Sequence, residues 1–314
     1  MSYELIVGRK TPGDLLNLTN SVTTASWITQ RTGNLRTPQS KIEEGDVVRF
    51  SADGELQFYG WVFSRGQDRW GPVDVVCYDR LRYLKANNSY TFYAQSAADI
   101  IKQICEDLQV DVGTLDDTGY KLPSLVMQDK SCIDIINTAI QKTLLNTGTV
   151  FVFYDSGDGV ALRSAADMKS DYIIGEKSLM TNYSYNTSID SQTYNSIKLV
   201  RPNKETGKSD VFIRKDSDTI ARWGLLQLYQ KVDEAATDAQ VKEQAKVSLE
   251  YYNRVLQQLK FTSLGVNSLR AGQLLLVNIN DLDGDPFRKY VMLEKVSHTW
   301  ENDLHTMELE AKAL

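Results

Sequence analysis

The sequence predicts a β-rich α+β fold, in which a small antiparallel barrel or sandwich, an α/β domain and a second β domain with one long inserted helix follow one another along the chain. Three observations predict this class. Apolar and polar residues alternate like strands through the first ~85 residues. Apolar residues then recur at helical spacing, and strand-like alternation returns from about residue 179. We therefore expect domains at 1–90, 91–178 and 179–314, with the inserted helix at 237–259.

Composition and charge restrict the class of protein. The chain has 314 residues, of which 42% are hydrophobic and 24% charged, and this is typical of a globular protein with more than one core. Its polar start predicts no secretory signal, and runs such as "LLLV" at 274–277 are too short to span a membrane. We expect a soluble protein made in the cytoplasm, without membrane insertion.

The balance of charge argues against tight nucleic-acid binding. The formal net charge is −6, from 41 acidic and 35 basic residues, and no long basic run occurs. The nearest candidate is "DRLRYLK" at 79–85. We interpret it as one strand leaving a sheet, with its basic residues on the polar face and its apolar residues on the other.

Three cysteines are widely separated along the chain. They are Cys77, Cys105 and Cys132, and no CxxC or CxxH pair occurs. Their odd number and wide spacing predict neither a disulfide framework nor a zinc site. We expect small buried hydrophobic side chains in a reducing compartment.

The first domain has a hairpin pattern. In "VVRFSADGELQFYGWVFSRG", aromatic and β-branched residues flank the turn dipeptide Asp53-Gly54. The segment "VDVVCYDRLRYL" is predicted as a further strand. A small antiparallel barrel or sandwich follows from this pattern.

Two helices are predicted in the middle domain. Ser96 with Asp99, and Ser131 with Asp134, have capping spacing before apolar residues at helical intervals. The two starts lie 35 residues apart, which raises the possibility of a helical repeat. Repeat architectures need about three units, and a strand pair at 149–163 follows instead. We therefore expect two separately capped helices beside a small sheet.

The last domain combines strands with one long helix. Thr237 and Gln240 form a predicted capping box, and the helix is expected over 237–259. Its apolar stripe is interpreted as packing within the domain rather than as a coiled-coil seam between subunits. The stripe consists of Val241, Ala245, Leu249, Tyr252, Leu256 and Leu259.

The only two histidines, His298 and His305, belong to "VSHTWENDLHTM". If Asn302-Asp303 form the loop of a hairpin, Trp300 faces His305 and His298 faces Met307. The imidazoles would then lie diagonally, about 7–8 Å apart, on a mainly apolar face. Since a catalytic zinc needs three protein ligands and Glu301 and Asp303 belong to the turn, we expect half-buried histidines rather than a metal site.

Other carboxylates are interpreted as turns. The group in "NDLDGDP" resembles a calcium loop, but its glycine and the residue at position twelve do not match the EF-hand pattern. No common catalytic motif occurs, so a non-enzyme is predicted, with no catalytic, cofactor-binding or metal residue and no cofactor. The carboxylates considered were Asp281, Asp283 and Asp285, the pair Asp116-Asp117, and Asp155 with Asp158.

Tryptophans leave a carbohydrate-binding alternative. Trp61, Trp70 and Trp223 are candidate platforms for sugars, although core or interface packing is the preferred interpretation.

Several segments resemble PBSX-type prophage tail proteins, the XkdQ/YqbQ group. "EEGDVVRFSADGELQFYGWVFSRGQDRWGPVDVVCYDRLRYLKANNSYTF" resembles the barrel of that group. Similar segments follow in the same order over nearly the whole chain, whereas residues 8–45 match loosely. They include "YNTSIDSQTYNSIKL" (185–199), "AGQLLLVNI" (271–279) and "YVMLEKVSHTWENDLHTMELE".

The resemblance implies a structural baseplate hub of a contractile phage tail or a phage-tail-like bacteriocin. Each chain would contain two small antiparallel β-barrel domains of the tube type. Three chains would form a pseudo-hexameric ring between the tail tube and a central spike, with other baseplate and tape-measure proteins as partners. The implied location is the virion or tail-like particle, after assembly in the bacterial cytoplasm. A ring that lets DNA pass should have an acidic lumen. The alternatives are a peptidoglycan hydrolase and a carbohydrate-binding tail module.

Overall fold

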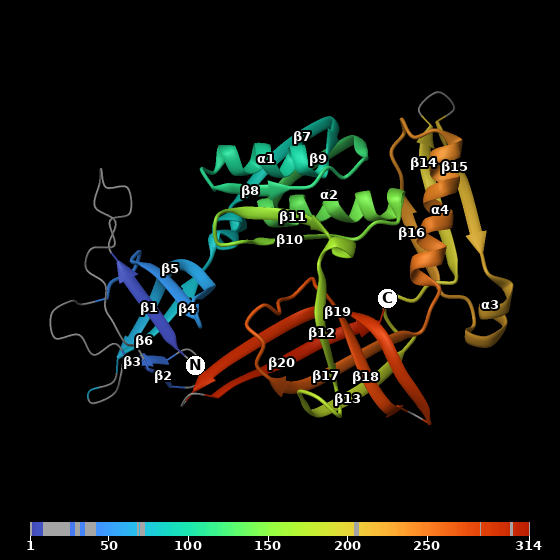
Figure 1. Cartoon of the computed structure of the whole chain (residues 1–314). Helices are drawn as coiled ribbons and strands as arrows, with labels where there is room; N and C mark the ends of the chain where they lie inside the picture. Colours follow the sequence, from blue (N-terminus) through green and yellow to red (C-terminus); the bar gives the residue numbers. More distant parts are fainter. Residues whose placement is uncertain are drawn as a thin grey trace.

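The computed structural model describes residues 2–8, 26–28, 32–34, 42–67, 69, 73–203, 207–282, 284–301 and 304–313. The helices and strands form four groups, and each group has its own cluster of buried hydrophobic side chains (Figure 1). They are a first six-stranded sheet, a middle α/β unit, a second six-stranded sheet, and a small α/β unit inserted into the second sheet.

The first sheet confirms the predicted hairpin. Asp53 and Gly54 form its turn, with φ angles of 50° and 82°, and the two strands pair from Val47 opposite Trp61. The sheet order is β1-β4-β5-β6-β3-β2. The strands are β1 (Tyr3–Gly8), β2 (Ser26–Ile28), β3 (Thr32–Asn34), β4 (Val47–Ala52), β5 (Glu55–Gln67) and β6 (Val73–Tyr78).

The interpretation of 79–85 as a strand is wrong. β6 ends at Tyr78, and residues Arg80–Lys85 form a short 3-10 helix, η1. The reason is local, because the Asp79 side chain caps η1 by accepting a hydrogen bond from the Leu81 N–H at 3.0 Å.

The middle unit confirms the two capped helices. Ser96 and Asp99 form a reciprocal capping box, and the Ser131 side chain accepts from the Asp134 N–H. Both helices bury isoleucines in one core with strands of two small sheets, β7-β9 and β10-β11-β8. The elements are β7 (Asn87–Ser96), α1 (Ala97–Asp107), β8 (Val112–Leu115), β9 (Lys121–Ser131), α2 (Cys132–Thr147), β10 (Phe151–Asp155), β11 (Val160–Ser164) and η2 (Ala165–Asp167).

The second sheet has the order β12-β18-β19-β20-β17-β13. Its buried face gathers aliphatic and aromatic residues from all of these strands. The strands are β12 (Lys169–Gly175), β13 (Met180–Ser188), β17 (Leu256–Leu264), β18 (Leu274–Leu282), β19 (Asp285–Glu301) and β20 (Leu304–Ala313).

The inserted unit contains more than the one long helix predicted. Its sheet, β15-β14-β16, is covered on one face by α4. The helix also ends earlier than predicted, because Asn253 follows it as the C-cap and Leu259 already lies in β17, where burial alternates with the strand period. The elements are β14 (Ser196–Asn203), β15 (Lys208–Lys215), α3 (Ser217–Trp223), β16 (Gln227–Lys231) and α4 (Asp238–Tyr252).

The β-rich α+β class is confirmed, but two closed antiparallel barrels are not. In the described residues each six-stranded sheet is open, since β1 and β2, and likewise β12 and β13, stand at opposite ends. The second sheet is also not wholly antiparallel, because β12 runs parallel to β18.

The two six-stranded sheets share one topology. Numbering the strands of each sheet in chain order gives 1-4-5-6-3-2 for both. The last four neighbour pairs of each order are antiparallel, and only the pairing of the first strand differs, being antiparallel for β1 and parallel for β12. The chain therefore contains the same sheet twice, with the α/β insertion between strands two and three of the second copy.

A detail of hydrogen bonding strengthens this equivalence. Gly45 N–H donates to the Val62 carbonyl at 2.8 Å, and Gly272 N–H donates to the Leu293 carbonyl at 2.7 Å. Both glycines have a φ of 90°. A register shift follows directly after Val62 in β5 and after Leu293 in β19. The glycine turn before strand four and the bulge in strand five are thus the same in both sheets.

Candidate functional site

The two histidines lie at the end of the β19–β20 hairpin, in the register expected from the sequence. Trp300 is opposite His305 and His298 is opposite Met307. The predicted separation of 7–8 Å is wrong, because the ring centroids are 5.1 Å apart and His298 Nδ1 lies 2.9 Å from His305 Nε2. Both imidazoles stack on the Trp300 indole, at 5.1 and 4.5 Å, and this shared platform brings them together.

The hydrogen bonds fix the tautomers of this pair. His298 Nε2 lies 2.8 Å from the Leu269 carbonyl oxygen, which only accepts, so His298 carries its proton on Nε2. The Nδ1 atom of a neutral His298 is then bare, and the proton between the rings belongs to His305 Nε2. His305 Nδ1 is therefore unprotonated, and it is buried without a hydrogen-bond partner in the described residues.

Burial keeps both rings neutral. Burial and, to a smaller extent, the nearby His298 lower the pKa of His305 to about 4. The pKa of His298 is also lowered, chiefly by burial. In the described part of the chain no three His, Cys, Asp or Glu side chains gather as a metal site. Asp303 lies outside the described residues, and the half-buried Glu301 continues β19.

Trp300 joins the hairpin to the first sheet. Its ring packs edge-on against Phe50 of β4, with centroids 4.9 Å apart, and the partly buried side chain lies against the buried cluster of the first sheet. Beside it, Asn267 Nδ2 donates to the Ala52 carbonyl at 3.3 Å. The hairpin that begins in the second sheet thus packs against the core of the first, and Figure 1 shows the end of β19 and β20 near the N-terminus.

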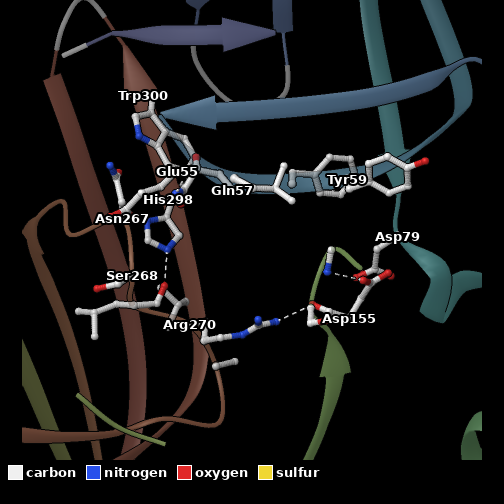
Figure 2. Close-up of a pocket in the computed structure, with 17 residues that line it drawn as sticks. Glu55, Gln57, Tyr59, Asp79, Asp155, Asn267, Ser268, Arg270, His298 and Trp300 are labelled. Atoms are coloured by element: carbon white, nitrogen blue, oxygen red, sulfur yellow. Dashed lines mark hydrogen bonds between the residues drawn. The ribbon is translucent and has the colours of Figure 1, made fainter. Parts of the chain in front are cut away.

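A cleft of about 310 Å³ opens where three units meet (Figure 2). Its walls come from β5, from the β10–β11 turn, from the loop before β18, and from β19. The lining is mainly polar and includes Glu55, Gln57, Tyr59, Asp79, Asp155, Ser156, Asn267, Ser268, Arg270, His298 and Trp300.

Two arginines hold the walls of this cleft together. Arg80 of η1 donates to both carboxylate oxygens of Asp155 at 3.1 and 3.2 Å, and both side chains are buried. From the second sheet, Arg270 donates to the Asp155 carbonyl at 3.0 Å, and its guanidinium lies 3.8 Å from the centre of the Tyr154 ring. Figure 2 shows Arg270 reaching across the cleft toward Asp155. The turn after β10 therefore contacts both neighbouring units through Asp155.

The second acidic residue of the cleft, Asp79, also makes a structural hydrogen bond. Burial raises the pKa of its carboxyl, and the nearby Asp155 raises it further. Its Oδ1 accepts the Leu81 N–H that caps η1. Since Asp155 binds Arg80 and also accepts the Gly157 N–H at 2.8 Å, both carboxylates make structural hydrogen bonds at the joint.

The remaining carboxylate candidates lie apart from the cleft or serve turns. Asp281 accepts the Gly284 N–H at 2.9 Å, and Asp283 is outside the described residues. Asp116 binds Arg163 at 3.1 Å, whereas Asp117 accepts the Gly119 N–H at 2.9 Å. Asp285 begins β19, and Asp158 belongs to the β10–β11 turn.

The cysteines and tryptophans also have identifiable positions. Cys105 and Cys132 are buried and Cys77 half-buried, all three are free, and burial raises each thiol pKa, as expected for packing residues. Trp223 ends α3 with Arg222 near its ring, and Trp70 lies outside the described residues.

Trp61 belongs to an aromatic face that the sequence interpretation missed. It packs edge-on against Tyr59 and Tyr83, while Phe63 contacts Tyr78 and Tyr83. The signal was the period-two spacing of Tyr59, Trp61 and Phe63 in β5. The contacts with Tyr83 show that η1 covers part of the first sheet's outer face.

No helix in the described residues is long and apolar enough to cross a membrane.

Comparison with known proteins identifies relatives over most of the chain. Residues 17–312 match a family model described as YQBQ-like. The uncharacterized protein YqbQ of Bacillus subtilis (strain 168) is 30% identical over 273 residues, which cover 86% of this chain and 81% of that protein. The protein XkdQ of the phage-like element PBSX, from the same organism, is 28% identical over 272 residues, covering 86% and 82%. The resemblance seen in the sequence is thereby confirmed.

Solved structures share the fold. The 43 kDa tail protein of prophage MuSo2 from Shewanella oneidensis has a TM-score of 0.65 and 12% identity, covering 98% of this chain and 97% of that one. The E. coli c3393 protein, a type VI secretion component described as similar to the T4 tail proteins gp27 and gp5, has a TM-score of 0.52 and 12% identity. That match covers 90% of this chain and 68% of the other. The fold of this chain is therefore one found in phage tail proteins.

Proposed function

The chain belongs to the YQBQ-like family, and from this premise we propose that it is a structural baseplate hub protein of a contractile phage tail or phage-tail-like particle. Three chains form a pseudo-hexameric ring that joins the tail tube above to the central spike below. Tape-measure and other baseplate proteins are further partners. The ring assembles in the bacterial cytoplasm and remains in the baseplate of the particle.

One observation carries the proposal, namely the repetition of the six-stranded sheet within the chain. Both sheets have the strand order 1-4-5-6-3-2, with the same glycine turn and the same bulge. Three chains supply six such sheets. A ring of three chains then presents six similar sheets to a six-fold tube. Because the two sheets of each chain are not identical, the same ring has true three-fold symmetry, which matches a three-fold spike.

The open edges of the sheets support contact between chains. β12 is an edge strand, and Tyr172 and Ile173 on it are 46% and 47% exposed. An unpaired edge with exposed apolar side chains is a common place for strand pairing between subunits. The joint described above supports the ring in another way, since Trp300, Asp155 and Arg270 fix the first sheet relative to the second.

The expected lumen is acidic. A conduit that binds phosphates would slow the passage of DNA, so acidic side chains should face the pore. The net charge of −6 agrees with this expectation.

The experiment is cryo-electron microscopy of intact particles. We expect three copies of this chain between the last tube ring and the spike, with both six-stranded sheets of each copy facing the axis. Six copies per ring, or absence of the chain from that junction, would overturn the hub. A basic lumen would overturn only the expectation about charge.

The enzyme alternative has its own test. A peptidoglycan hydrolase would release soluble fragments from purified cell walls, and the activity would be lost in Asp155→Asn. We expect no release from either protein, because the Asp155 carboxylate binds Arg80 and the Gly157 amide.

A further inference from the structure

The inserted α/β unit lies outside the topology that the two sheets share. Residues 189–255 separate strands two and three of the second sheet, whereas only three residues separate β2 from β3 in the first. The ring contacts that the two sheets have in common therefore do not require this unit. Figure 1 places this unit at the edge of the molecule, where α4 contacts α2 of the middle unit.

One face of the inserted sheet is covered by α4, whereas in the described residues most side chains of the other face are exposed, apart from the buried Ser196 and Val200 of the central strand. Ile197, Leu199 and Phe212 point toward α4 and pack with Val241 and Ala245. Residues one position along each strand point the other way. The register aligns Lys198 with Ile213 on β15 and with Tyr229 on β16, and it aligns Val200 with Val211 and Lys231. We call this second side the insert face; it consists of Ser196, Lys198, Val200, Pro202, Ser209, Val211, Ile213, Lys215, Gln227, Tyr229 and Lys231.

The insert face combines an apolar centre with positive charge. Val211, Ile213 and Tyr229 are 52%, 59% and 53% exposed. Its charged residues are Lys198, Lys215 and Lys231, and no acidic residue belongs to it among the residues of β14, β15 and β16. In the described structure none of these lysines forms an ion pair.

We propose that the insert face binds another baseplate protein, one that presents carboxylates around an apolar centre. The inference rests on the proposed hub function. Charge complementarity identifies the chemistry of the partner, since three lysines without internal counterions favour an acidic surface. The apolar centre identifies its class, because Val211 and Ile213 match buried apolar groups of a protein and offer nothing to the phosphates of a nucleic acid.

A second copy of this chain fits the face less well as the occupant. Self-association through one patch would be isologous and would bring the lysines of two copies together. A different protein with acidic residues avoids that repulsion.

The test is zero-length carbodiimide coupling in purified particles, because this reagent joins a lysine only to a carboxylate in direct contact. We expect Lys198 and Lys231 to couple to Asp or Glu of a different particle protein. The exposed Lys242 on α4 is the matched control and should not couple to that protein. Amine labelling should fall at least fivefold at Lys198 and Lys231 between the free chain and the particle, and should stay unchanged at Lys242.

Variants supply an independent arm. The double variant Lys198→Glu/Lys231→Glu should keep the circular dichroism spectrum of the free chain, and should reduce coupling to the partner at Lys215 at least tenfold. Lys242→Glu should leave that coupling unchanged.

Three outcomes overturn the inference. They are full labelling of both lysines in the particle, coupling only to other copies of this chain, and protection by nucleic acid that a nuclease removes. Absence of the chain from the particle would overturn the hub proposal instead, so the two failures are distinguishable.

Discussion

At the scale of residues, the histidine pair shows how a polar group is accommodated at a buried joint. Two imidazoles share one hydrogen bond, and the Leu269 carbonyl sets the direction of the proton. The only lone pair left for another proton is on His305 Nδ1, which is buried and has no partner in the described structure. Protonation there would place a cation against the Trp300 ring inside the joint.

Stability should therefore fall in acid. The pKa of His305 is about 4 in the folded chain, compared with about 6.5 when unfolded, so the unfolded state binds more protons between these values. The free energy of unfolding is then highest above pH ~6.5 and declines toward pH ~4, by as much as ~3 kcal/mol. Urea unfolding at several pH values measures this decline.

A variant can separate the contribution of the two histidines to this pH dependence from that of other titratable groups. The pKa of Asp79 is raised in the folded chain, so protonation of this carboxyl increases the free energy of unfolding as the pH falls, opposite to the effect of His305. We expect His298→Gln/His305→Gln to be less stable at pH 7 and to show a smaller decline between pH 6.5 and 4. Since the chain has only two histidines, nitrogen NMR of the rings can also identify the tautomers. A proton on Nδ1 of either ring at pH 7 would contradict the assignment.

Gly265 provides a second prediction at this scale. A Cβ atom at this position would lie 1.9 Å from His305 Cγ, so the imidazole packs directly on the backbone of Gly265. We expect Gly265→Ala to lower the free energy of unfolding by about 1–3 kcal/mol through overpacking. Gly66→Ala is the control, because a Cβ atom there meets open space. Equal effects of the two variants on the urea midpoint would contradict close packing at His305.

Only those contacts of the site that join residues close together in the sequence were predictable from it. The hairpin register of His298, Trp300 and His305 followed from the alternation of residues around a short loop. The arginines could not be found in the same way. Arg80 meets an aspartate 75 residues later, and Arg270 meets the carbonyl of that same Asp155 across 115 residues. No spacing rule connects positions so far apart.

At the scale of elements, capping residues predicted the first residue of each helix better than apolar spacing predicted the last. The caps at Ser96, Ser131 and Thr237 each begin a helix where expected. The end of α4 was placed too late because Leu256 and Leu259 continue a four-and-three spacing that also fits the start of a strand. The short apolar run after Asp79 was ambiguous for a similar reason, and its cap decided in favour of η1.

The two glycine turns give a matched pair of variants. Gly45 and Gly272 have the same φ of 90°, which L-residues rarely adopt, so alanine at either position should cost about 1–3 kcal/mol. The surroundings differ, since a Cβ atom at Gly45 meets nothing within 4 Å, whereas one at Gly272 lies 2.2 Å from Val152 Cγ1. We expect Gly272→Ala to be the more damaging by about 1–3 kcal/mol.

Chemical unfolding measures both variants. A third variant, Gly272→Ala/Val152→Ala, separates the two costs, because it removes the Val152 methyl groups from the region of the clash while keeping the unfavourable φ. If Gly45→Ala proved neutral, the equivalence of the two glycine turns would be limited to their hydrogen bonds.

At the scale of the whole molecule, the strand order that the two sheets share was not predictable from the alternation of residues. The two copies share strand order and backbone hydrogen bonds, and neither feature requires particular side chains. Equivalent positions such as Val62 and Leu293 have only their apolar character in common. The insertion at 189–255 further separates strands that are adjacent in the first copy. The β-rich class was predictable, because it depends only on the alternation of residues.

The last prediction concerns the joint that connects the units. Arg80 and Asp155 are 8% and 4% exposed at their side chains, and Arg80 lies directly after the first sheet while Asp155 ends β10 of the middle unit. Removing one member of a buried pair leaves the other charge uncompensated. We expect Arg80→Met to lower the free energy of unfolding by about 3–5 kcal/mol, as measured by urea unfolding.

A double-mutant cycle distinguishes the ion pair from simple packing. Arg80→Met/Asp155→Leu removes both charges, so it should recover part of the stability that Arg80→Met loses. The control pair is Lys246→Met/Glu243→Leu, an exposed ion pair on one face of α4, for which coupling should not exceed ~0.5 kcal/mol. Additive losses at Arg80 and Asp155 would mean that the joint depends on aromatic contacts such as Trp61 with Tyr83, rather than on the buried charge pair.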